Sequence, residues 1–286
     1  MPLIHIIINV VLIILFFATG YFLSGKRKLT IILYVILLSL ILVKGYILTY
    51  RPDIFTNLVA FSWAIFYFNF YPFAVAAFIP LAWKYAKGRS QKIRVVFLCG
   101  IFFLISLYPY HYFLLPLAQT RPMITDENGV VIQTSADTCS AAAATTLASL
   151  YDIETTEAEV VKLALTKKNR GTDRLGLYRA LKILAERSDK DLNVHIEKIS
   201  AKKLVEYNLP AIITVGIPAE PETPGEKKMV RVYNWDPGAV HDVCYMGNVG
   251  GTKPLRVRIG EPEFGLEIWE IGALEILHKG MAIFME

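Results

Sequence analysis

The sequence predicts an all-α region of four transmembrane helices followed by an α+β domain. Of its 286 residues, 54% are hydrophobic and only 19% are charged, whereas soluble domains average about 45–50% apolar and about 25% charged residues. The charge is also unevenly divided, because residues 1–117 carry a net charge of +9 and residues 118–286 a net charge of −4. In the second part, helix-like apolar spacing gives way to alternating spacing, which indicates helices followed by strands.

Four apolar runs within residues 1–117 are each long enough to cross a bilayer, which takes about 20 helical residues. They lie at residues 3–24, 29–49, 57–83 and 95–116. The prolines in the last two runs are tolerated in membrane helices. We therefore expect four transmembrane helices over residues 1–117, a linker over 118–127 and a folded domain over 128–286.

The basic residues between these runs orient the predicted helices. Gly25–Lys28 contributes three positive charges and Lys84–Arg94 contributes five, whereas Arg51–Thr56 carries one Arg and one Asp. The positive-inside rule places the two basic loops in the cytoplasm. We therefore expect a multi-pass integral protein of the inner or plasma membrane, in contact with the lipid bilayer. Its C-terminal domain would lie on the outer face, periplasmic or extracellular.

The predicted domain begins with helices and ends with strands. Helices are expected at residues 139–151, 156–165, 175–187 and 270–277, the first of them capped by Asp137 or Thr138. Strands are expected at residues 130–133, 194–199, 211–217, 229–233, 241–247, 255–259, 266–269 and 282–284. The stretch 218–227 reads as an exposed loop. Helices before strands predict an α+β fold.

Four residues of this domain form a candidate catalytic set. Cys139 begins a helix, where the helix N-terminus and a neighbouring imidazolium would favour the thiolate. His241, at the start of a strand, would take the thiol proton and later give it to the leaving amine. Glu261 would hold the imidazole in the required tautomer, with Asn248 as the alternative. The side chain of Gln133 and the backbone N–H of Cys139 would hold the developing oxyanion.

At these residues the sequence resembles the papain-like cysteine peptidases that process bacteriocin precursors after a double-glycine leader. The resemblance covers roughly residues 128–286 and is carried by the segments Gln133-Thr-Ser-Ala-Asp-Thr-Cys139-Ser-Ala-Ala, Gly171-Thr-Asp-Arg-Leu-Gly-Leu, His241-Asp-Val-Cys and Gly260-Glu-Pro. That family usually has Gly after the Cys and Asp as the third residue, where this chain has Ser140 and Glu261. The resemblance implies a papain-like fold and cleavage after small residues such as Gly-Gly, here in a membrane-anchored variant with the peptidase domain at the C-terminus.

We therefore expect a membrane-bound hydrolase, a cysteine peptidase that cleaves a peptide or protein through a thioester and matures a secreted or surface protein. The transmembrane helices would also dock a partner membrane or secretion protein. Two alternatives stay open at this stage. One is a catalytically silent papain-like module that only binds peptides, and the other is a papain-like acyl transferase that passes the thioester to an amine.

Several other classes are excluded by the sequence. No Cys or His cluster has zinc spacing, so we expect no metal and no cofactor. Gly247–Lys253 fails the phosphate-loop pattern, which argues against a nucleotide ligand, and the charge distribution argues against nucleic acid. Cys244 lies three residues after His241, so it is expected on the opposite strand face, in the core. A disulfide between Cys139 and Cys244 is the alternative that would block the thiol.

Overall fold

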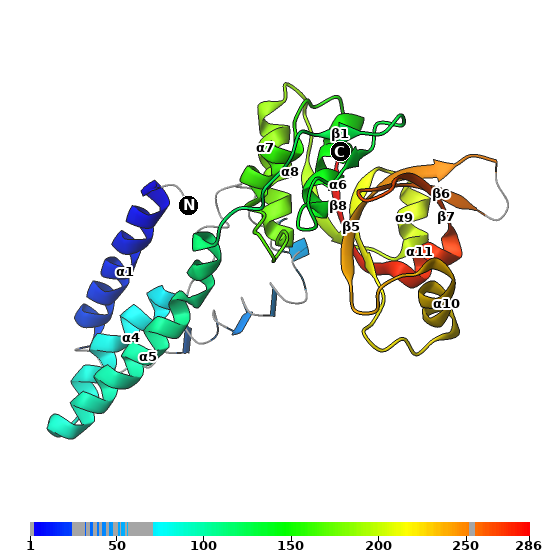
Figure 1. Ribbon diagram of the computed structural model, residues 1–286. Coiled ribbons are helices and arrows are strands. Elements are labelled where there is room, and N and C mark those ends of the chain that lie inside the picture. The colour runs from blue at the N-terminus through cyan, green and yellow to red at the C-terminus, as the bar shows by residue number, and fades with distance from the viewer. Residues whose placement is uncertain are drawn as a thin grey trace. The chain divides into compact units, whose positions relative to one another are not determined.

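The computed structural model describes residues 3–24, 71–251 and 255–286, together with isolated residues between 32 and 56 (Figure 1). The chain divides into two compact units, the first of residues 1–51 and 63–115 and the second of residues 52–62 and 116–286. The predicted membrane run at 29–49 lies largely outside the described residues, as does the first half of the run at 57–83. The predicted linker at 118–127 contains the short strand β1 (Ile124–Thr125), which pairs with β2 (Val131–Ile132).

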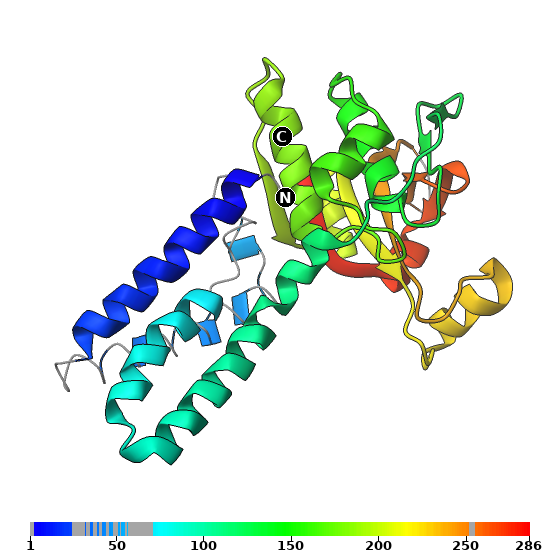
Figure 2. The same cartoon turned by 60° about the vertical axis from the view of Figure 1, so that its left-hand side comes forward.

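The helices of the first unit with described bounds are α1 (Leu3–Leu23), α4 (Tyr71–Tyr85) and α5 (Gly88–Leu114). Figure 2 shows α4 and α5 joined as a helical hairpin. A small apolar cluster links α1 to α4, where the rings of Phe16 and Phe73 stack with their centroids 5.7 Å apart. Gly20 lets the two helices approach closely, because a Cβ there would lie 2.2 Å from the carbonyl oxygen of Ala77.

One segment among the described residues is long and apolar enough to cross a membrane, namely Gly88–Leu107 of α5. Its large side chains are mostly exposed, including Phe97 (67%), Phe102 (60%) and Leu104 (69%). The apolar segment Ile7–Leu23 of α1 is shorter than this span. The described residues therefore supply one candidate membrane helix where the sequence predicts four, and the four-helix region is not confirmed.

The second unit is an α+β domain, as predicted from the sequence. Its six-stranded sheet has the order β3-β8-β4-β5-β6-β7, and all neighbouring strands are antiparallel. The strands are β3 (Val194–Lys198), β4 (Ala211–Gly216), β5 (Val240–Val249), β6 (Arg256–Glu261), β7 (Gly265–Glu270) and β8 (His278–Met285).

Helices cover both faces of this sheet (Figure 1). The helices of one layer are α6 (Cys139–Leu150), α7 (Glu157–Ala164) and α8 (Arg174–Arg187), and those of the other are α9 (Ala201–Tyr207), α10 (Pro224–Tyr233) and α11 (Ile271–Leu277). Successive strand residues face opposite layers. Ile212 therefore packs in the α6 layer while Ile213 packs in the α9 layer. Burial on both faces explains the nearly unbroken apolar run of β4.

The prediction of a strand at residues 229–233 is wrong, because these residues form the last half of α10. The predicted loop at 218–227 is also too long. Thr223 and Glu226 form a capping box, and Pro224 occupies the first turn, where its fixed φ favours a helix. These helix-start signals decide the structure here, although the alternating apolar residues at 229–233 on their own favour a strand. Helix α9, capped by the Ser200 side chain, was not predicted either.

Candidate active site

Cys139 is the first residue of α6, and its side chain is partly exposed. Neither predicted cap acts as one, since the hydroxyl of Thr138, the N-cap residue, donates instead to the carbonyl oxygen of Ser135, 2.8 Å away. In the described part of the second unit, α7, α8, α9 and α10 each have a side-chain cap. The start of α6 has no side-chain cap. The N–H groups of its first turn can therefore stabilise a negative charge on the sulfur of Cys139.

Small side chains hold α6 against the rest of the domain. Ala141, Ala142, Ala143 and Ala144 have no exposed surface. Thr146, one turn further along, accepts a hydrogen bond of 2.9 Å from the backbone N–H of Val131. The nucleophile candidate therefore sits at the end of a rigid, fully packed helix, with its own side chain still accessible.

His241 is the second residue of β5 and pairs with Val215 of β4. Its Nε2 hydrogen bonds with Oε1 of Glu261, and the Cys139 side chain lies close enough to the ring to raise its pKa. Burial lowers the pKa of His241, but the hydrogen bonds and charges of Cys139 and Glu261 outweigh burial and raise that pKa from 6.5 to about 10. Because Nε2 is bound to Glu261, Nδ1 is the ring nitrogen left for Cys139.

Glu261 ends β6, and only 6% of its side chain is exposed. Its Oε2 accepts hydrogen bonds of 2.8 Å from the backbone N–H groups of Glu263 and Phe264. An ionised carboxylate can only accept hydrogen bonds, so His241 is the donor to Oε1. Both carboxylate oxygens are thus held in place, one by the following turn and one by the imidazole.

Asn248, the alternative orienting residue, lies elsewhere in the domain. Its Oδ1 accepts a hydrogen bond from the hydroxyl of Tyr245 and its Nδ2 donates to the carbonyl oxygen of Val205. Both ends of the side chain are therefore engaged away from His241. Of the two candidates for orienting the imidazole, the structure places the carboxylate of Glu261, and not the carboxamide of Asn248, against His241.

Gln133 follows β2 and is tied to the turn beside Glu261. Its backbone N–H donates to the carbonyl oxygen of Pro262, 2.7 Å away, and the next backbone N–H, of Thr134, donates to Oε1 of Glu157. Its side-chain Oε1 is buried and has no hydrogen-bond partner among the described residues. A buried amide oxygen without a hydrogen-bond partner carries a desolvation cost.

The sequence reasoning missed Asp242, which links the two halves of the site. Its Oδ2 accepts a hydrogen bond of 2.6 Å from the Ser140 hydroxyl, and its Oδ1 accepts one of 2.7 Å from Thr214. Hydrogen bonds to a charged acceptor are short and strong. A hydrogen bond therefore joins Ser140, which follows Cys139, to Asp242, which follows His241. We call Ser140, Asp242 and Thr214 the Asp242 bridge.

Breaking this bridge at Ser140 is expected to loosen the Cys139–His241 contact. Ser140→Ala should slow alkylation of Cys139 by iodoacetamide near neutral pH by about 10- to 100-fold, because small misplacements of reacting groups cost that much. Ser140→Thr, which keeps the hydroxyl, should restore most of the rate. Ser149→Ala is the matched control, since that hydroxyl donates within α6, to the carbonyl oxygen of Thr146. Equal rates for the two alanine variants would show that the bridge does not position the thiol.

The other cysteines are placed apart from this chemistry. Cys244 is fully buried in the core of the α6 layer, and burial raises the pKa of its thiol. Cys99, Cys139 and Cys244 are all free, so the structure contains no bond between Cys139 and Cys244. Within the described residues, no group of three or more His, Cys, Asp or Glu side chains is placed to hold a metal ion.

No protein-family model matches this sequence, and neither does any curated protein. Similar solved structures include the peptidase domain of Streptococcus ComA, a bifunctional ABC transporter of a quorum-sensing pathway, at 19% identity and a TM-score of 0.39. That match covers 54% of this chain and 94% of the other. The peptidase domain of Streptococcus mutans ComA matches at 19% identity and a TM-score of 0.35, covering 54% of this chain and 96% of that one.

A double-glycine motif protease from an AMS/PCAT transporter, solved in complex with the leader peptide, matches at 16% identity and a TM-score of 0.40. The match covers 59% of this chain and 96% of that one. Likenesses at these identities and TM-scores transfer no activity. A function for this chain therefore has to be drawn from the geometry of Cys139, His241 and Glu261.

Proposed function

We propose that the second unit is a papain-like cysteine peptidase that hydrolyses an amide bond of a peptide or protein. The observation that carries this proposal is the placement of Cys139 and Glu261 beside the His241 imidazole, with Glu261 hydrogen bonded to the ring. It joins a part-exposed thiol at an uncapped helix start to an imidazole whose pKa is raised, and then to a buried carboxylate. A nucleophile, a base and a group that orients the base are the parts that covalent catalysis needs.

In the first half of the reaction the Cys139 thiolate attacks the carbonyl carbon of the scissile amide. The carbonyl oxygen becomes an oxyanion, which the Cys139 backbone N–H and the Gln133 side-chain amide would stabilise. The C–N bond then breaks, and the His241 imidazolium gives its Nδ1 proton to the departing amine. The products of this half are a free amine and a thioester on Cys139.

In the second half, water hydrolyses the thioester. Neutral His241 takes a proton from water, whose oxygen attacks the thioester carbon, and the C–S bond breaks to release the acid and the Cys139 thiolate. Throughout, Glu261 keeps Nε2 protonated, so that Nδ1 alone exchanges protons with the reactants. The turn hydrogen bonds of Glu261 keep its Oε1 aimed at the ring.

Incubation of the purified chain with peptides containing a Gly-Gly site, and with a mixed peptide library, tests this proposal by mass spectrometry. We expect new carboxyl termini after small residues, as the sequence resemblance implies. A thiol-directed peptide probe should label Cys139 and leave the buried Cys244 unlabelled. Labelling without cleavage would instead indicate a silent peptide-binding module, and products joined to an added amine would indicate an acyl transferase.

We further propose that the first unit spans an inner or plasma membrane four times, with the peptidase on the outer face, where it matures a secreted or surface protein. The exposed apolar surface of α5 and the basic turn before it support the insertion of this one helix, with its first residues on the cytoplasmic side. Four helices exceed what anchoring requires, so they would also dock a partner membrane protein. A tag added after Glu286 should be removed by protease supplied outside intact cells, and a protected tag would contradict this orientation.

A further inference from the structure

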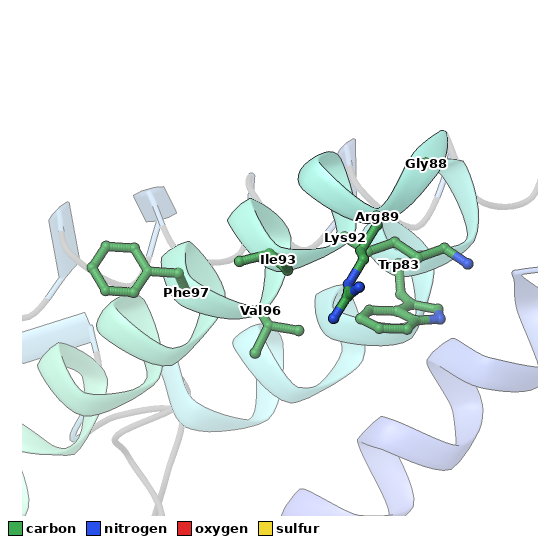
Figure 3. A pocket seen from close by; sticks show the side chains of 7 residues that line it. All are labelled: Trp83, Gly88, Arg89, Lys92, Ile93, Val96 and Phe97. Carbon is green, nitrogen blue, oxygen red and sulfur yellow. The ribbon is translucent and has the colours of Figure 1, made fainter.

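The hairpin of α4 and α5 contains a pocket of about 670 Å³ that combines basic and apolar side chains. Its lining residues are Trp83, Gly88, Arg89, Lys92, Ile93, Val96 and Phe97. Figure 3 shows Trp83, Arg89 and Lys92 gathered near the turn, while Ile93, Val96 and Phe97 follow along α5 away from it. The pocket is therefore amphipathic along the helix.

Sequence spacing explains this arrangement. The α5 residues 89, 92, 93, 96 and 97 recur at intervals of three and four, so they lie on one face of the helix. Near the start of α5 this face presents the guanidinium of Arg89 and the ammonium of Lys92, whereas the pocket residues that follow are all apolar. A ligand that matched the whole face would need an anionic end and a hydrocarbon end.

The positive end of the pocket has no carboxylate near it in the sequence. Residues 71–117 contain no Asp or Glu, and the five basic residues between Lys84 and Arg94 lie within eleven positions. The Nζ atom of Lys92 lies 5.3 Å from the ring centroid of Trp83. Such a cation–π contact orients the ammonium without neutralising its charge. The positive charges of the hairpin therefore favour the binding of an external anion.

We infer that this pocket binds one anionic phospholipid. Arg89 and Lys92 would hold the phosphate, and one acyl chain would lie along Ile93, Val96 and Phe97, whose side chains are exposed. Trp83 would lie at the level of the headgroups, where tryptophan is enriched in membrane proteins. Basic pockets between helices on the cytoplasmic side suit such headgroups. This inference rests on the proposed membrane insertion of the first unit, and it is independent of the peptidase chemistry.

Native mass spectrometry of the detergent-solubilised full chain tests the lipid site. We expect phosphatidylglycerol to be retained at concentrations about tenfold lower than phosphatidylcholine. Combining Arg89→Gln with Lys92→Gln should weaken phosphatidylglycerol binding by about 30-fold, the effect of removing two basic groups that face an anionic headgroup. Lys87→Gln with Arg94→Gln is the matched control, because it removes the same charge from the same stretch of sequence outside the pocket lining.

Two further measurements identify the bound ligand and distinguish a failure of the lipid site from a failure of membrane insertion. Phe97→Ala should weaken phosphatidylglycerol binding, and inorganic phosphate should not displace the lipid; displacement by phosphate would show a free-anion site and overturn the inference. Flotation of the chain with liposomes of either lipid tests insertion itself. A chain that floats without preferring phosphatidylglycerol contradicts only the lipid site, whereas a chain that does not float contradicts both proposals.

Discussion

Replacing Cys139 with Ser is expected to abolish peptide cleavage, with a loss of about 10⁶-fold, the size seen when a catalytic nucleophile is removed from a comparable set. The reason is that His241, with its pKa raised to about 10, is placed to share its proton with a thiolate. A serine hydroxyl at the same point would have to lose a much more tightly held proton. The measurement is the rate of product formation from the best cleaved peptide.

Cys244→Ala supplies the control for this substitution. Cys244 is also a free cysteine of the second unit, but it is fully buried in the core. Its replacement should leave the cleavage rate within a few-fold, while lowering the free energy of unfolding through lost packing. If Cys139→Ser still cleaved at a substantial rate and Cys244→Ala did not, the assignment of the nucleophile would be wrong.

Glu261→Gln is expected to lower the cleavage rate by roughly 10³- to 10⁴-fold, as in related sites whose orienting carboxylate becomes an amide. The backbone N–H groups of Glu263 and Phe264 require an acceptor at the Oε2 position. The amide oxygen of Gln would take that place, so its NH₂ would face His241 Nε2. The imidazole proton would then reside on Nδ1, and the ring could no longer take a proton from Cys139.

The same substitution should change the pH dependence. The pKa of His241 is raised from 6.5 to about 10, so the stability contributed by its charged form is fully present below about pH 6.5 and is lost as pH rises through about 10. In Glu261→Gln the alkaline limb of activity, and of thermal stability, should move downward from pH 10. Glu263→Gln, an exposed change in the same turn, should leave both limbs in place. An unchanged alkaline limb in Glu261→Gln would show that Glu261 does not contribute to the raised pKa of His241.

The sequence indicated Cys139, His241 and Glu261 because each has a local signal, namely a helix start, a strand start and a Gly-Glu-Pro turn. The choice between Glu261 and Asn248 needed the tertiary structure. Both residues follow His241 in the sequence, but only the side chain of Glu261 contacts the imidazole in the fold. The spacing alone gave their order but not their contacts.

The Asp242 bridge could not be predicted, because it depends on strand register. Thr214 faces Asp242 only through the pairing of β4 with β5, and Ser140 reaches it across 102 positions of sequence. Helix α10 was misassigned for a different reason: five alternating apolar residues looked like a strand, while the capping box lay just upstream. Local patterns therefore identified the individual site residues better than the contacts that hold them together.

The position of β8 has a consequence for the timing of activity during synthesis. This strand is made after every candidate catalytic residue, yet it lies inside the sheet, between β3 and β4. A ribosome-bound chain that ends before His278 has the thiol and the imidazole but cannot complete the framework that spaces them. The growing polypeptide is therefore expected to be proteolytically inert, and its first cut waits until translation has passed the last strand.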